Sequence, residues 1–457
     1  MEASKPTNRL RIAISGGGLA GATIASALQS NPHLEVNIYE SAAQFSERGA
    51  AVGISVNGQR ALEEISTEVR DALDKAGAVK MNSSRLMIAT GPAAGSLLFD
   101  LAGAEPTLVV HRAAFLQELL KPIPSGSLHA NKKLVKIQDA PDGEKGILLT
   151  FADGSVEHAD LLIGADGIHG FVRKYLLGDN HPATDAKFAG FWDCRSLVPF
   201  EKAKKLLGEE YFKEDRQYGW IGDGAMLLHD VLDNGKTVQC VAAIFSDGNS
   251  GFEDSKSWKT PIDRKKLEDA LATWKECPIT QGIIDHFLLP EYRYSNLESL
   301  ERKIGTKSLL LENPEPLAYA EYHHLDAPTY IKGNVCLMGD AAHAMTPWQG
   351  SGAGMAFEDA MVLQTLLADV RDASQLAAAL QAYDATCRPR SQRVVASSRE
   401  TGVILCGSAP EIGVEPDKLL ASLATRWGFI HELDMKAHKA EARSLTHELL
   451  RGDAHGA

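Results

Sequence analysis

Residues 10–40 read LRIAISGGGLAGATIASALQSNPHLEVNIYE, and this stretch decides the fold. The apolar run Leu10–Ser15 leads into three consecutive glycines. Leu19–Gln29 is rich in alanine and has a helical pattern, and Leu34–Tyr39 is a second apolar run. A strand, a glycine turn, a helix and a second strand in this order predict the first βαβ unit of a Rossmann-type α/β domain.

The glycine turn has the spacing GxGxxG, which suits a bound pyrophosphate. Gly16 permits the tight turn, Gly18 lets the backbone approach the phosphates, and Gly21 lets the helix pack closely on the sheet. The amino end of the helix attracts negative charge. The predicted phosphate-binding residues are therefore Gly16, Gly18, Leu19, Ala20 and Gly21.

Glu40 ends the second strand, 19 residues after Gly21. A carboxylate there can accept hydrogen bonds from a ribose diol and would repel a 2′-phosphate. With both strands and this acid in place we predict a dinucleotide site rather than a purely structural glycine turn. The motif alone does not distinguish FAD from NAD.

A second glycine-rich motif, GDAAH, begins at Gly339 and follows the apolar run Asn334–Met338. Asp340 stands at a strand end, where it can bind polyol hydroxyls. Gly350, Gly352 and Ala353 let main-chain amides at a helix start approach a flat ring, and the positive end of that helix favours negative charge on the ring. The alternative is a glycine-rich turn with a capping Asp. His343 in this motif is expected to be structural.

A third motif lies in residues 163–173, where Asp166-Gly167 precedes Arg173. A carboxylate and a guanidinium beside a sharp turn can bind pyrophosphate indirectly and touch a visiting nicotinamide nucleotide. The alternative is a solvent-exposed turn.

The sequence pattern changes in the part of the chain between the third motif, at 163–173, and the second motif, which begins at Gly339. Strand-like runs at Gly190–Pro199, Ala225–Leu232 and Thr237–Phe245 predict an antiparallel sheet inserted in the nucleotide-binding domain. We therefore divide the chain into a first FAD- or NAD-type segment at 1–186, an inserted substrate sheet at 187–321, a return of the first domain at 322–370, and a helical C-terminal region at 371–457.

The composition and net charge of the chain argue against some classes of function. The 457 residues carry a formal net charge of −13, which argues against a general binder of nucleic acid or anionic membranes. An anionic substrate would need a local cationic pocket. The six cysteines have no metal-ligand spacing, and the N-terminus has no apolar signal segment. We expect a cytoplasmic protein with reduced thiols and no membrane span; the sequence gives no indication of the oligomeric state.

The three motifs, in this order, resemble the flavoprotein aromatic hydroxylases of the para-hydroxybenzoate hydroxylase fold. The subgroup most similar contains salicylate hydroxylase and fungal enzymes that hydroxylate polyketide phenols, and the stretches Val110–Leu116 and Leu423–Trp427 add to the likeness. The resemblance implies bound FAD, with O₂ and NADH or NADPH as co-substrates. Because no second GxGxxG follows a later strand, we expect NAD(P)H to bind transiently over the FAD.

The resemblance also implies roles for single residues. The family residue that matches Arg112 lies against the flavin, and those that match Glu40 and Asp340 bind ribose and ribityl groups. The resemblance also predicts that Gly53 lies near the flavin. Ala51 departs from the glycine that relatives often have, and Gly170 replaces a serine.

The reaction sets demands on the pocket. Reduced flavin and O₂ give an electrophilic C4a-hydroperoxide, which must be kept dry, and a cation beside the substrate favours the reactive phenolate. Arg195 interrupts a strand of the inserted sheet, and the family's corresponding arginine faces the substrate. The alternative is an arginine on the solvent face, paired with Asp193.

Three histidines are further candidates for the substrate pocket. His229 and His323 are predicted to face the substrate as a hydrogen-bonding partner or base, and His324 stays open because the register there is uncertain by one or two residues. A packing or surface role for His229 is the alternative.

The predicted function is NAD(P)H-dependent hydroxylation of a phenolic, salicylate-like substrate, with or without loss of its carboxyl group. The alternatives are a dearomatising hydroxylase or epoxidase of a fungal secondary-metabolite pathway, and a non-catalytic flavin-binding protein of the Rab escort type. A halogenase is disfavoured because the WxWxI sequence is missing.

Overall fold

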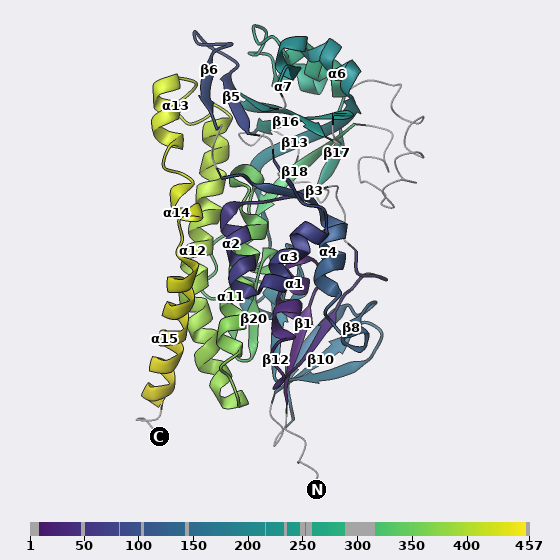
Figure 1. Ribbon diagram of the computed structural model, residues 1–457, viewed down its shortest axis with the longest axis vertical. Coiled ribbons are helices and arrows are strands. Elements are labelled where there is room, and N and C mark those ends of the chain that lie inside the picture. The colour runs from purple at the N-terminus through teal and green to yellow at the C-terminus, as the bar shows by residue number, and fades with distance from the viewer. Residues whose placement is uncertain are drawn as a thin grey trace, which may run out of the picture.

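The computed structural model describes residues 9–46, 51–81, 83–101, 105–141, 146–214, 216–232, 235–246, 252, 258–287 and 316–453. Two sheets organise these residues, one at each end of the molecule, and the C-terminal helices run along both (Figure 1). The predicted α/β class, with a Rossmann-type domain, an inserted sheet and a helical C-terminal region, is confirmed.

The first sheet has the strand order β19-β20-β12-β1-β2-β8. β1 pairs in parallel with β2 on one side, through the crossover helix that connects them, and with β12 on the other. The near-continuous burial of β1 matches its apolar sequence, which is typical of a strand covered on both faces. The strands are β1 (Leu10–Ser15), β2 (Leu34–Tyr39), β8 (Leu128–His129), β12 (Leu161–Gly164), β19 (Ile331–Lys332) and β20 (Val335–Leu337).

Helices cover this sheet and connect it to the rest of the chain. α1 packs on α11, α11 packs on α2, and the long α12 packs on α15 (Figure 1). The helices of this part are α1 (Leu19–Leu28), α2 (Val56–Ile65), α3 (Thr67–Lys75), α4 (Arg112–Leu120), α5 (Phe171–Leu177), α10 (Asp340–His343), α11 (Gly352–Leu367), α12 (Leu376–Leu405), α13 (Pro416–Leu423), α14 (Gly428–His431) and α15 (Met435–Asp453).

The second sheet has the order β17-β18-β13-β16-β15-β14-β5-β6. The three predicted strands are present and antiparallel to one another. The sheet also includes β5 and β6 from the first segment of the chain, and β5 pairs with β14 in parallel. The strands are β5 (Ser84–Ile88), β6 (Leu97–Asp100), β13 (Lys187–Pro199), β14 (Gln217–Gly222), β15 (Ala225–Leu232), β16 (Thr237–Phe245), β17 (Lys259–Pro261) and β18 (Leu317–His323).

The two faces of the second sheet have different neighbours. Helices α6 (Phe200–Leu207), α7 (Arg264–Ala270) and α8 (Thr280–Phe287) belong to the outer layer, and α6 and α8 contact β13 and β16. The inner face turns towards the Rossmann domain and the C-terminal helices (Figure 1). Since side chains alternate along a strand, each strand sends every second residue to the inner face.

Two small sheets complete the described fold. One contains β9 (Leu134–Asp139), β10 (Ile147–Phe151) and β11 (Val156–Ala159), and the other contains β3 (Ala51–Ile54), β4 (Val79–Lys80) and β7 (Leu108–His111). All six cysteines are free and buried, as their spacing predicted. Among the described helices, none is long and apolar enough to cross a membrane.

Candidate active site

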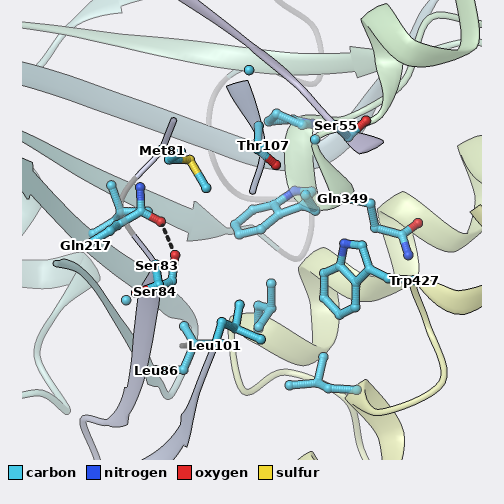
Figure 2. Close-up of a pocket in the computed structure, with 18 of the residues that line it drawn as sticks. Ser55, Met81, Ser83, Ser84, Leu86, Leu101, Thr107, Gln217, Gln349 and Trp427 are labelled. Atoms are coloured by element: carbon cyan, nitrogen blue, oxygen red, sulfur yellow. Dashed lines mark hydrogen bonds between the residues drawn. The ribbon is translucent and has the colours of Figure 1, made fainter. Parts of the chain in front are cut away.

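A cavity of about 970 Å³ lies between the inner face of the second sheet and the C-terminal helices. Figure 2 shows Leu86, Leu101 and Gln217 on the sheet side, with Gln349 and Trp427 opposite them. The lining is mostly apolar, which suits an aromatic ligand and a reaction that must exclude water.

The floor of the cavity follows the alternation of the strands. Five strands each contribute residues two positions apart, so that their side chains project to the same side. These floor residues are Asp193 and Arg195 on β13, Val241 and Ala243 on β16, Met226 and Leu228 on β15, Gln217 and Gly219 on β14, and Ser84 and Leu86 on β5. Glu321 on β18 extends the floor beyond β13.

The opposite wall is made by the segments predicted to lie against a flat ring. Gly53, Ser55 and residues 347–350 line the same cavity. Gly350 has φ +63°, a conformation that glycine adopts without strain. Ala51 pairs with His111 across β3 and β7, and Arg112 begins α4 directly after that pair. The residues predicted near the ring therefore share one end of the β3–β7 pair.

The GxGxxG turn has the geometry of a phosphate cradle. Gly16 has φ +108°, and a Cβ there would strike the main chain of Ala165. A Cβ at Gly21 would strike the Gly16 carbonyl. Helix α1 begins after Gly18, which makes no side-chain capping bond, and no acidic residue lies in its first turn, so the positive end of the helix suits an anion.

Glu40 lies beside this turn and is held by main-chain amides. The Gly17 amide donates to Oε2 at 2.7 Å, and the Ala42 amide donates to Oε1 at 2.7 Å. These bonds fix the carboxylate next to the helix start, where a ribose attached to the phosphates would lie.

The second helix start repeats this arrangement. α11 begins at Gly352, and its cap residue Ser351 makes no side-chain capping bond. No acidic residue lies in its first turn. Asp340 follows β20 and is exposed, so its carboxylate is accessible to the hydroxyl groups of a ligand. The start of α1 thus suits phosphates, and the start of α11 suits a ring that gains negative charge.

Asp166 lies between these two starts and occupies the space next to Gly170. The Val172 amide donates to its Oδ2 at 3.0 Å, and burial raises the pKa of Asp166 to about 6. Within the described residues its buried Oδ1 has no hydrogen-bond partner. A Cβ at position 170 would collide with this carboxylate, so the packing here favours glycine.

Arg173 does not do what its motif predicted. The side chain is 1% exposed, and burial lowers its pKa to about 10. It cannot reach a visiting nicotinamide, because its donors are engaged with main-chain carbonyls. These carbonyls belong to Ala183, Leu325, Ala341 and Ala342. Arg173 therefore fixes the GDAAH segment in place.

Arg195 lines the cavity rather than the solvent face of the sheet, and it is paired with Asp193. Its Nε donates to Asp193 Oδ1 at 2.7 Å and its Nη2 donates to Oδ2 at 3.2 Å. The Arg195 side chain is 46% exposed, yet it lies deep in the protein, because the surface it exposes is cavity wall. The Asp193 carboxylate raises the pKa of Arg195, which stays charged.

Glu321 is a cavity residue that the sequence analysis missed. It is 7% exposed, and the Trp348 indole donates to its Oε2 at 2.9 Å. Burial, followed by the neighbouring Asp193 charge, raises the pKa of Glu321 well above its usual range. The clue in the sequence was its position two residues before His323, on the same face of one strand.

His229 faces the wrong side of the sheet, and its predicted pocket role is corrected. On β15 its neighbour Leu228 lines the cavity, so the alternation turns His229 to the outer layer. It is 1% exposed and stacks on Tyr218, with ring centroids 5.2 Å apart. The alternative, a packing histidine, is the correct one.

The later histidines are also outside the described cavity lining. His323 is partly buried at the end of β18, beyond Glu321. His324 is buried with its Nε2 3.1 Å from the Ile168 carbonyl, and burial lowers its pKa to about 3. His343 Nε2 lies 2.7 Å from Asp359 Oδ2 in the core, so its expected structural role is confirmed.

Comparison with characterised proteins agrees with this geometry. Residues 291–398 match the family model described as an FAD binding domain. The chain is 35% identical to 6-methylsalicylate 1-monooxygenase of Aspergillus terreus, over 88% of this chain and 84% of that one. It is 31% identical to a salicylate hydroxylase of Pseudomonas putida, with 95% of each chain covered.

The fold agrees as well. A salicylate hydroxylase–substrate complex superimposes with a TM-score of 0.75 at 26% identity, covering 95% of this chain and 98% of that one. The residues around the starts of α1 and α11 fit FAD, because the glycine cradle leaves no room for a Cβ and the buried Oδ1 of Asp166 has no hydrogen-bond partner among the described residues. The chain therefore belongs to the FAD-dependent aromatic hydroxylases that include salicylate hydroxylase and a group of fungal monooxygenases.

Proposed function

We propose that this protein hydroxylates a phenolic ring held in the described cavity, with NADH or NADPH and O₂ as co-substrates. One observation supports this most strongly. A single cavity has the predicted flavin segments, Gly53 and residues 347–350, on one wall and Arg195 on the other. A ring bound between them would meet the cofactor on one side and a guanidinium on the other.

The chain would hold FAD at three places. Gly16 to Gly21 would bind the pyrophosphate, Glu40 and Asp340 the ribose and ribityl hydroxyls, and the start of α11 the flavin ring. Bound FAD, once reduced by NAD(P)H, supplies the activated oxygen. The remaining work belongs to the protein: it binds and orients the substrate and keeps water away from the reacting ring.

Arg195 would orient the substrate and favour its phenolate form. A guanidinium beside a phenol oxygen stabilises the negative charge, and a phenolate ring attacks an electrophilic oxygen more readily than a neutral phenol does. Asp193 accepts two hydrogen bonds from the guanidinium and so fixes its orientation before the substrate binds. Arg195 therefore loses less conformational entropy on binding.

The cavity wall also favours a ring with apolar substituents. Leu101 and Leu420 line the cavity with apolar side chains. A substituted ring that packs against them supports a second candidate outcome, hydroxylation at a carbon that already bears a substituent, with loss of aromaticity.

The proposal is tested on the purified yellow protein. We expect NADH or NADPH consumption to rise several-fold on addition of salicylate or a polyketide-type phenol, with a hydroxylated product by mass spectrometry. Catechol from salicylate indicates decarboxylating hydroxylation, and a non-aromatic product indicates the second outcome. Slow consumption that no phenol stimulates, with peroxide as the sole product, would contradict the proposal for the phenols tested.

A further inference from the structure

We propose that the Glu321 carboxyl donates a hydrogen bond to a carbonyl-type oxygen, of a carbonyl or carboxylate substituent, on the substrate ring. This inference rests on the proposed function, since it assigns a residue that selects the substrate at the same site. It makes Glu321 a substrate-contacting residue that differs in role from the guanidinium of Arg195.

The hydrogen bond from Trp348 determines which carboxyl oxygen carries the proton. The indole N–H can only donate, so Glu321 Oε2 must accept. Oε1 is then the atom that can carry a proton. Among the described residues no hydrogen bond to Oε1 is found, although the side chain is 93% buried and lines the cavity. A protonated carboxyl that accepts from Trp348 with one oxygen can donate from its other oxygen to a ligand in the cavity.

The charges around the cavity favour the neutral form of Glu321. Two arginines line the cavity, and each already has a carboxylate partner: Arg195 with Asp193 at 2.7 Å, and Arg60 with Glu105 at 2.8 Å. An ionised Glu321 would add a second negative charge beside Asp193, and the opposing effects of Arg195 and Trp348 on its pKa are smaller. Burial acts in the same direction, because it penalises the charged form.

Two donors of different charge would therefore reach the same ligand. Arg195 would contact the phenol oxygen, and Glu321 would contact an acceptor on a neighbouring substituent. β13 and β18 are adjacent in the sheet, with Asp193 opposite Tyr319, so Arg195 and Glu321 stand on the floor to either side of this pair. Two contacts fix the rotation of the ring, whereas one contact leaves the ring free to turn about it.

The experiment is a binding cycle on the holoenzyme, read from the change in flavin absorbance. The dissociation constants of resorcinol and 2,4-dihydroxybenzaldehyde are compared, because the second ligand adds only the acceptor. We expect the aldehyde group to strengthen binding about five- to tenfold in the native protein, the size of a net hydrogen bond. 2,4-Dihydroxybenzoate in place of the aldehyde distinguishes a carboxylate acceptor from a carbonyl acceptor.

Two variants at position 321 separate donation from ionisation. Glu321→Gln keeps an N–H donor and an acceptor for Trp348, so the ratio of dissociation constants should stay within about twofold of the native ratio. Glu321→Leu keeps the volume and removes the donor, so the ratio should fall to about one. Glu157→Gln and Glu157→Leu, on the exposed strand β11, are matched surface controls that should leave the ratio unchanged.

The outcomes decide the proposal. An unchanged ratio in Glu321→Leu would overturn it. A collapse of the ratio in both position-321 variants would also overturn it, because the N–H donor of glutamine should replace the O–H donor of Glu321. Retained flavin absorbance and a native melting temperature exclude misfolding. If the ligands bind but none stimulates NAD(P)H consumption, the proposed function fails while this inference is still measured.

Discussion

The cofactor cradle and the cavity floor are built in different ways. The cradle consists of main chain: two helix starts without side-chain caps, and a turn in which Gly16 has φ +108°. The floor consists of side chains from neighbouring strands, such as Asp193, Arg195 and Glu321. A backbone cradle tolerates little change at any position, whereas a side-chain floor can be altered residue by residue without disturbing the cofactor. The first region fixes the type of chemistry, and the second selects the substrate.

The largest effect is expected at Gly16. Gly16→Ala places a Cβ against the main chain of Ala165 in a backbone conformation that alanine rarely adopts, so the cradle must open. We expect FAD affinity to fall more than about 100-fold, or the protein to lose several kcal/mol of stability. FAD content after gel filtration and the melting temperature measure this.

Gly154→Ala is the matched control for that variant. Gly154 also has a positive φ, +84°, but a Cβ there meets open space. It should cost about 1 kcal/mol and leave FAD bound. Equal loss of FAD in both variants would show that the close approach at Gly16 is unimportant.

Arg195→Ala should separate the two regions. We expect FAD to remain bound and substrate-dependent kcat/KM to fall about 100- to 1,000-fold, because the group that stabilises the phenolate is removed. The ratio of product to peroxide should fall with it. Native kcat/KM in a yellow variant would show that Arg195 serves only its ion pair with Asp193.

Asp340→Ala should weaken the cradle without destroying it. Loss of a hydrogen bond from a charged group corresponds to about a ten- to 100-fold weaker binding of FAD. Titration of the apoprotein with FAD, followed by fluorescence, measures this change. Asp340→Asn should lie between the variant and the native protein, and full retention of FAD by both would remove Asp340 from the cofactor site.

The smallest effect is expected at His229. His229→Phe keeps an aromatic ring on Tyr218 behind the sheet, so kcat/KM should change less than about twofold and stability by about 1–2 kcal/mol. A large loss of activity with native FAD content would restore the original prediction that His229 acts in the pocket.

The difference between the regions also explains what the sequence could predict. Gly16, Glu40 and Asp340 stand in local patterns, in which a motif and its flanking strands are contiguous in the chain. Arg195 was predicted because it breaks the apolar pattern of a strand. Sheet register was not predictable, and a shift of one residue sends a side chain to the other face. Such a shift separates His229 from Leu228, which lines the cavity. His323 lies on the same face of β18 as Glu321 but at the end of the strand, beyond the described lining.

Long-range contacts account for the other features of the site that the sequence did not predict. Arg173 contacts carbonyls more than 150 residues away, at Leu325, Ala341 and Ala342. Burial and then the Asp193 charge raise the pKa of Glu321, and Trp348 donates a hydrogen bond to one of its oxygens; both partners come from other elements. Pairings of this kind follow from the packing of the whole fold, so no local pattern in the sequence indicates them.

The six buried cysteines have a consequence for the lifetime of the enzyme. A monooxygenase that loses its activated oxygen before transfer releases hydrogen peroxide, and peroxide attacks thiolates. Every cysteine of this chain is buried, and for each thiol burial raises the pKa, which keeps it protonated. The protein therefore resists damage by its own by-product, and oxidative inactivation should begin at groups other than its thiols.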